Sequence, residues 1–66
     1  MIRYRIHVYT IENNKEKVKN YNCRHFTVNN NSLVLYPVDF NETIHILLNP
    51  AMMFEVYPYI IHLETD

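Results

Sequence analysis

The chain has 66 residues, enough for a single domain over residues 1–66, but a chain this short buries only roughly 60% of its unfolded surface. Six Lys and Arg residues nearly balance seven Asp and Glu residues, which argues against a strongly basic nucleic-acid binder and excludes a highly acidic mimic of DNA. One cysteine and no glycine exclude an internal disulfide and a glycine-rich phosphate-binding loop.

The first residues, Met-Ile-Arg-Tyr-Arg-Ile, predict the start of a mature strand rather than a signal peptide. No apolar run approaches the roughly 20 residues that span a bilayer, so we expect a protein without a membrane segment, in the reduced cytoplasm of a bacterial host cell. Because 48% of the residues are hydrophobic and no disulfide stabilises so small a domain, we also expect self-association, as a homodimer.

Residues 2–11 alternate between apolar and polar side chains, which predicts a half-buried strand. The face expected to join the core carries Ile2, Tyr4, Ile6 and Val8, and the opposite face carries Arg3, Arg5, His7 and Tyr9. Residues 12–15 predict a turn, and a long, partly irregular strand is expected from about Lys19. A helical turn or an arm over residues 12–22 stays open as an alternative.

Turns that need a positive φ must use Asn or Asp in this chain, because it has no Gly. Asn30 and Asn31 are therefore predicted to form the two-residue turn of a hairpin. This turn pairs Val28 with Leu33 and Phe26 with Leu35, on one face; the other face carries His25, Thr27, Val34 and Tyr36. Pro37 is expected to end the pairing, and a turn over residues 39–42 follows.

Residues 43–48 alternate again, with Ile44, Ile46 and Leu48 inward and His45 outward. Asn49-Pro50 then breaks the chain, with a short helical turn at 50–53 as an option, and Met52, Phe54 and Val56 repeat the inward pattern. Pro58 makes residues 51–64 either one kinked strand or two edge strands. The predicted fold class is all-β: a small antiparallel sheet of five or six short strands, strongly bent or closing into a small barrel.

The residues that suggest chemistry do not form a recognisable catalytic motif. His7, His25, His45 and His62 all fall opposite apolar positions, but nothing in their spacing brings three imidazoles to one metal, so we expect no metal site and no cofactor. Cys23 and His25 lie two residues apart on a strand, about 6.5 Å, which is too far for a nucleophile and its base. We therefore expect a protein that is not an enzyme.

Tyrosine and arginine at outward positions predict a binding surface, since both residue types are enriched in interface hot spots. The predicted binding residues are Arg3, Arg5, His7, Tyr9, Arg24, Tyr36, Tyr57 and Tyr59. Another protein is the expected partner, because the net charge of −1 disfavours the alternative, a small β module for RNA or single-stranded nucleic acid. A structural subunit of a larger particle is a third hypothesis.

Nine Asn, seven Ile and six Tyr residues against a single Ala are a bias typical of chains encoded by AT-rich genomes. In size and in this bias, the chain is similar in type to accessory proteins of bacteriophages that infect low-GC hosts. Such proteins often inhibit a host defence or regulatory protein by steric occlusion. That similarity implies the same expectation here: a small binding protein for host takeover, without catalytic activity.

Overall fold

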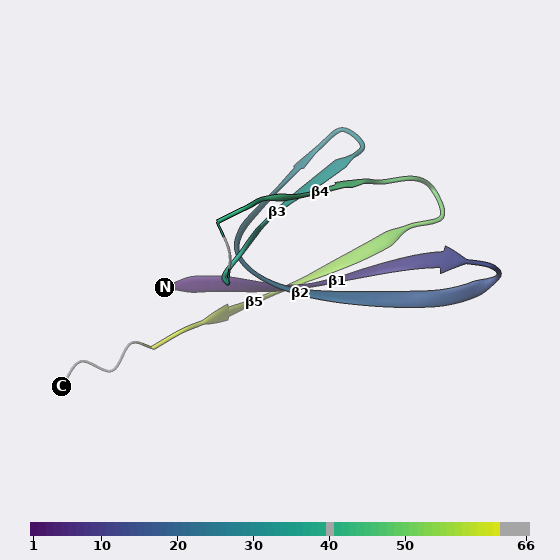
Figure 1. Cartoon of the computed structure of the whole chain (residues 1–66). Helices are drawn as coiled ribbons and strands as arrows, with labels where there is room; N and C mark the ends of the chain where they lie inside the picture. The colour runs from purple at the N-terminus through teal and green to yellow at the C-terminus, as the bar shows by residue number, and fades with distance from the viewer. Residues whose placement is uncertain (40, 63–66) are drawn as a thin grey trace.

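The computed structural model describes residues 1–39 and 41–62, which form a single five-stranded antiparallel sheet in the order β4-β3-β2-β1-β5 (Figure 1). The strands are β1 (Ile2–Glu12), β2 (Lys15–Asn29), β3 (Ser32–Pro37), β4 (Ile44–Leu47) and β5 (Met53–Ile60). The described residues contain no helix, so the all-β prediction is confirmed. In particular, this part of the chain has no helix with the length and apolarity needed to cross a membrane.

The β1–β2 hairpin turns at Asn13 and Asn14, whose φ angles of 51° and 62° are both positive. Two central residues with positive φ are the mark of a type I′ turn, which matches the twist of the strands on either side. The residues on either side of this turn, Glu12 and Lys15, already pair with each other. The predicted start of this long strand, about Lys19, is therefore wrong, because the tight turn extends regular pairing back to Lys15.

The β2–β3 hairpin has the predicted register. Asn30 and Asn31 form its turn, Val28 pairs with Leu33, and Phe26 pairs with Leu35. A β-bulge between Cys23 and His25 divides β2 into two halves. The first half pairs with β1 and the second half with β3, because the extra residue bends the strand and increases its twist.

The chain passes from β4 to β5 through a turn in which the Met52 amide donates to the Asn49 carbonyl at 2.9 Å. β5 then runs without interruption through Pro58, which pairs with Tyr4, so the single-strand alternative is confirmed as far as Ile60. The remainder of the predicted strand, to Glu64, lies partly outside the described residues, as does Phe40 in the predicted turn at 39–42.

The core lies on the inner face of the bent sheet. Five side chains are fully or almost fully buried: Ile6, Val8, Cys23, Leu33 and Leu35. The inward residues predicted on β4 and β5, including Ile44, Phe54 and Val56, are half-buried and pack against this core. Figure 1 shows the half of the sheet that contains β3 and β4 folded over the half that contains β1 and β5. The edge strands β4 and β5 do not pair, so the sheet is strongly bent and open rather than a closed barrel.

Candidate binding surface

Six of the eight predicted binding residues lie together on the outer face of β1 and β5. In the register of these strands, Arg3 pairs with Tyr59 and Arg5 with Tyr57. His7 and Tyr9 continue the same face along β1. We call this surface the Tyr/Arg face; its residues are Arg3, Arg5, His7, Tyr9, Tyr57 and Tyr59.

Side chains on the Tyr/Arg face contact each other along one diagonal of the sheet. The Arg5 guanidinium carbon lies 5.4 Å from the centre of the Tyr59 ring. The rings of His7 and Tyr57 are 5.1 Å apart. Arg5 and His7 thus each contact the β5 residue two positions beyond their direct partner, a distance that long and aromatic side chains can bridge in a twisted sheet. These contacts link neighbouring side chains of the Tyr/Arg face across the two strands.

Glu55 places a carboxylate in the middle of this surface. The Tyr57 hydroxyl donates a hydrogen bond to its Oε2 atom, and Tyr9 is a second hydrogen-bond partner. These two bonds, the Tyr57 bond first, hold the pKa of Glu55 below its usual range, and the nearby His7 adds to the effect. The same carboxylate raises the pKa of both tyrosine hydroxyls. Glu55 is therefore a fixed negative charge that two tyrosines surround.

An exposed apolar patch borders the Tyr/Arg face around Tyr9. Tyr9 pairs with Val18 on one side and with Met53 on the other. Val18 is 47% exposed, Met53 58% and Ile11 61%. Sequence reasoning missed this patch, because it left residues 12–22 without a defined conformation. The signal was present in the period of two, which puts Val18 on the same face as Tyr9 once β2 starts at Lys15.

The other two predicted residues, Arg24 and Tyr36, form a separate cluster beside the bulge. The guanidinium carbon of Arg24 lies 5.8 Å from the centre of the Tyr36 ring, and its Nε donates to the Pro37 carbonyl at 3.4 Å. The rings of His25 and Tyr36 are 5.3 Å apart. The bulge interrupts the regular alternation and Arg24 extends toward β3, so the predicted surface is divided into two clusters.

Residues that sequence patterns single out for chemistry lie apart. His7 and His25 each pack on a tyrosine, and His45 shares a 3.0 Å hydrogen bond with Thr43. In residues 1–39 and 41–62, no three His, Cys, Asp or Glu side chains are grouped as a metal site requires. Cys23 is a free, fully buried thiol, and burial raises its pKa, which disfavours the reactive thiolate.

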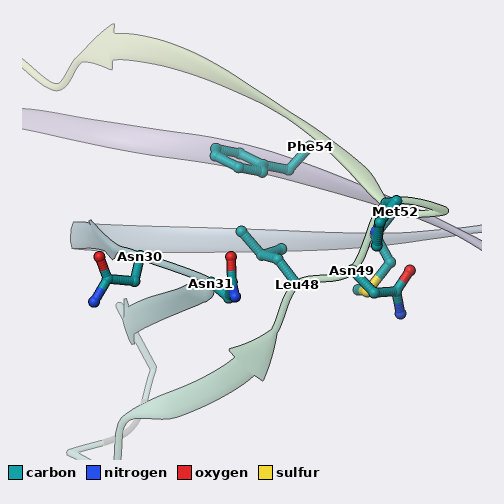
Figure 2. A pocket seen from close by; sticks show the side chains of 7 residues that line it. Asn30, Asn31, Leu48, Asn49, Met52 and Phe54 are labelled. Carbon is teal, nitrogen blue, oxygen red and sulfur yellow. The ribbon is translucent and has the colours of Figure 1, made fainter.

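A groove of about 500 Å³ opens at one end of the bent sheet. Figure 2 shows the side chains of Leu48, Met52 and Phe54 together with the amide side chains of Asn30, Asn31 and Asn49 among those that line it. None of the residues that line the groove is ionisable, so the groove offers no acid, base or charged ligand. Its chemistry suits an uncharged group with an apolar body.

Comparison of the chain with protein-family models, with curated proteins and with solved structures finds no match.

Proposed function

We propose that this protein is a non-catalytic module that binds another protein through the Tyr/Arg face and inhibits that partner by occluding its surface. The observation that supports this proposal is the ordered ladder of Arg5, His7 and Tyr9 against Tyr59, Tyr57 and Glu55, beside exposed Val18 and Met53. Tyrosine, arginine and methionine are enriched in protein interfaces, and a preorganised surface loses less conformational entropy on binding.

The ladder favours a protein partner over a nucleic acid. The Glu55 carboxylate lies among Tyr9, Tyr57 and His7, where it would repel a phosphate backbone. The Arg5 guanidinium is already placed over the Tyr59 ring, and the Tyr59 hydroxyl donates to the Asn22 side chain. A protein partner can present an amide or a cation to Glu55 and apolar side chains to Met53, so it satisfies the whole surface.

A small module for single-stranded nucleic acid is the second candidate function. The observation in its favour is the pairing of cations with aromatic rings, Arg5 with Tyr59 and Arg24 with Tyr36, because bases stack on such rings beside cations. The bulge in β2 separates these two cation–aromatic pairs, so they do not form one continuous surface along which a single strand of nucleic acid could bind.

The proposed function is tested by affinity capture from lysate of a low-GC bacterium, followed by measurement of Kd with the purified captured protein. We expect Tyr57→Ala to weaken binding by at least about 30-fold, the effect of losing a hot-spot side chain. Tyr36→Ala is the matched control, since it removes the same side chain from the separate cluster, and it should leave Kd within about three-fold. Circular dichroism verifies that both variants fold.

Salt separates the two candidate functions. Contacts to phosphates weaken steeply between about 0.05 and 0.2 M salt, whereas an interface of aromatic and apolar side chains does not. If the captured ligand is a nucleic acid that salt releases, the protein-binding proposal is wrong. Equal Kd values for the wild type and Tyr57→Ala would reject the Tyr/Arg face as the binding surface.

A further inference from the structure

The first half of β2 has a free backbone edge. Backbone groups in an antiparallel strand point alternately to its two neighbours. The Asn22 carbonyl accepts a hydrogen bond from the Val38 amide at 3.0 Å, so Asn22 points away from β1. Glu16, Val18 and Asn20 are even-numbered like Asn22, so their backbone N–H and C=O groups point to the same side, away from β1. In the part of the chain that the structure describes, β3 begins to pair only at Cys23, and no strand lies along these three residues.

A second hydrogen bond, at the other edge of the sheet, gives the same assignment. The Ile61 amide donates to the Met1 carbonyl at 2.9 Å, so odd-numbered residues of β1 point to β5 and even-numbered residues point to β2. Lys17 and Lys19 are opposite Thr10 and Val8, and hence their backbone groups bond to β1. The even-numbered residues of β2 remain for the free edge.

Three lysines line one face of this edge. Lys15, Lys17 and Lys19 alternate with Glu16, Val18 and Asn20, and all six are exposed. Lys17 forms an ion pair of 3.0 Å with Glu12, and within residues 1–39 and 41–62 neither of the other two lysines has an ion-pair partner. A lysine at every second position therefore lies beside the unpaired backbone groups of β2. This edge runs along the β1–β2 hairpin, whose tip is at the far right of Figure 1.

The sequence separates its charges along the chain, a signal that the near-zero net charge concealed. All six Lys and Arg residues lie within residues 1–24. Five of the seven acids follow residue 38: Asp39, Glu42, Glu55, Glu64 and Asp66. The β1–β2 hairpin is consequently a basic element in a protein with a net charge of −1.

We propose that an extended acidic segment of another protein adds to the sheet as a further strand along Glu16–Asn20. Its main chain would pair with the free amides and carbonyls of Glu16, Val18 and Asn20. Carboxylates at every second position would face Lys15, Lys17 and Lys19, because directly opposed residues in an antiparallel pair share a face. Main-chain bonds supply affinity in this mode of recognition, and the alternate charges supply specificity.

Two other occupants fit this edge less well. If the β2 strands of two copies paired antiparallel, odd-numbered residues would lie opposite odd-numbered residues. Lysines of one copy would then be directly opposite lysines of the other. A nucleic acid would use the amides of the edge, but the carbonyls that alternate with them would repel its phosphates. An extended peptide satisfies both kinds of backbone group.

The test measures amide hydrogen exchange in the full ¹⁵N-labelled chain with the synthetic peptide Thr-Glu-Val-Glu-Val-Glu-Thr. Amides of Glu16, Val18 and Asn20 should exchange quickly in the free protein and at least about ten-fold more slowly with the peptide, since each gains a ladder bond. A peptide with Gln in place of each Glu should bind about five-fold more weakly than the Glu peptide.

Charge variants identify the lysines. Lys15→Gln with Lys19→Gln should weaken peptide binding about five-fold. Thr27→Glu with Asn41→Glu changes the net charge by the same two units at exposed sites away from this edge, and it should leave binding within about two-fold. Val18→Pro removes one donor of the free edge without removing a bond to β1, and it should abolish the protection at Asn20.

Three results would overturn the inference: no change at these amides with the peptide, equal binding by the lysine double variant, or an oligothymidylate that protects them better than the peptide. This edge and the Tyr/Arg face are tested separately, because Tyr57→Ala should leave peptide binding intact. Failure of one proposal therefore does not imply failure of the other.

Discussion

At the scale of single residues, asparagine performs the conformational role that glycine usually has in hairpins. Asn13, Asn14 and Asn30 all have a positive φ, between 51° and 62°. Asn tolerates this region better than other residues with a Cβ atom, because its short polar side chain can hydrogen-bond locally. The two hairpin turns of a chain without Gly are thus located by their Asn pairs.

Replacement of Asn30 should show this role directly. Asn30→Ala should lower the free energy of unfolding by about 1 kcal/mol, because Ala pays the steric cost of the left-handed region without a compensating hydrogen bond. Asn31→Ala is the control: Asn31 lies in the same turn without a positive φ, and the change should be within about 0.3 kcal/mol. Urea unfolding measures both values, and equal losses would contradict the explanation.

At the scale of elements, the pairing of β1 with β5 brings Tyr9 beside Glu55 and so makes the stability of the protein depend on pH. Hydrogen bonds from Tyr57 and Tyr9 lower the pKa of Glu55 from its ordinary 4.5. The unfolded chain therefore takes up this proton more readily than the folded chain. The contribution of Glu55 to stability is complete above its ordinary pKa and is lost as the pH falls through its lowered, folded value.

We expect the stability of the protein to fall as the pH decreases below about 5, and Glu55→Gln to make this decrease shallower. Glu42→Gln, in the β3–β4 connection, is the matched control and should leave the slope close to that of the wild type. Urea midpoints at a series of pH values between about 6 and 3 provide the measurement. A Glu55→Gln curve parallel to that of the wild type would show that the tyrosine bonds do not form in solution.

The pairing of β5 with β1 also explains how the sheet tolerates Pro58. The Ile61–Met1 bond places the Pro58 nitrogen on the side away from β1, so the missing N–H costs no bond inside the sheet. The outer edge of β5 lacks one donor as a result. Proline on β5 and lysines on β2 both disfavour pairing of two copies edge to edge.

At the scale of the whole molecule, the core is thin. The hydrophobic core of the described residues has only five fully or almost fully buried side chains, and several apolar residues of β4 and β5 are half-buried around the open side of the sheet. Marginal single-domain stability is the expected result. Burial of the half-exposed residues against a second copy would increase stability, which is the physical reason to expect a homodimer.

A homodimer should make the thermal midpoint depend on protein concentration. We expect Tm to rise by about 5 to 10 °C over a hundred-fold increase in concentration, because association stabilises the folded chain by mass action. Differential scanning calorimetry measures the shift, and sedimentation velocity at the same concentrations reports the mass. A constant Tm with a monomeric sedimentation coefficient would reject the dimer.

Local sequence patterns predicted much of this fold. The alternation in residues 2–11 identified the buried positions Ile6 and Val8 of β1, although Ile2, predicted on the same face, is 54% exposed at the start of the strand. Asn30-Asn31 set the correct pairs between β2 and β3. Both features depend on neighbouring residues alone: a strand repeats every two residues, and a two-residue turn defines the register of its hairpin. For the same reason, Arg5 and His7 were placed correctly on the outer face.

The tertiary structure decided which strands meet. The order of the sheet, its open form and the bulge that separates Arg24 from the Tyr/Arg face all depend on contacts between distant parts of the chain. The free edge of β2 exists because β1 covers one half of that strand and β3 the other. By itself, the sequence determined the two faces of the strands and the hairpin at Asn30-Asn31, because these are local; strand partners, which are not local, determined where a ligand could bind.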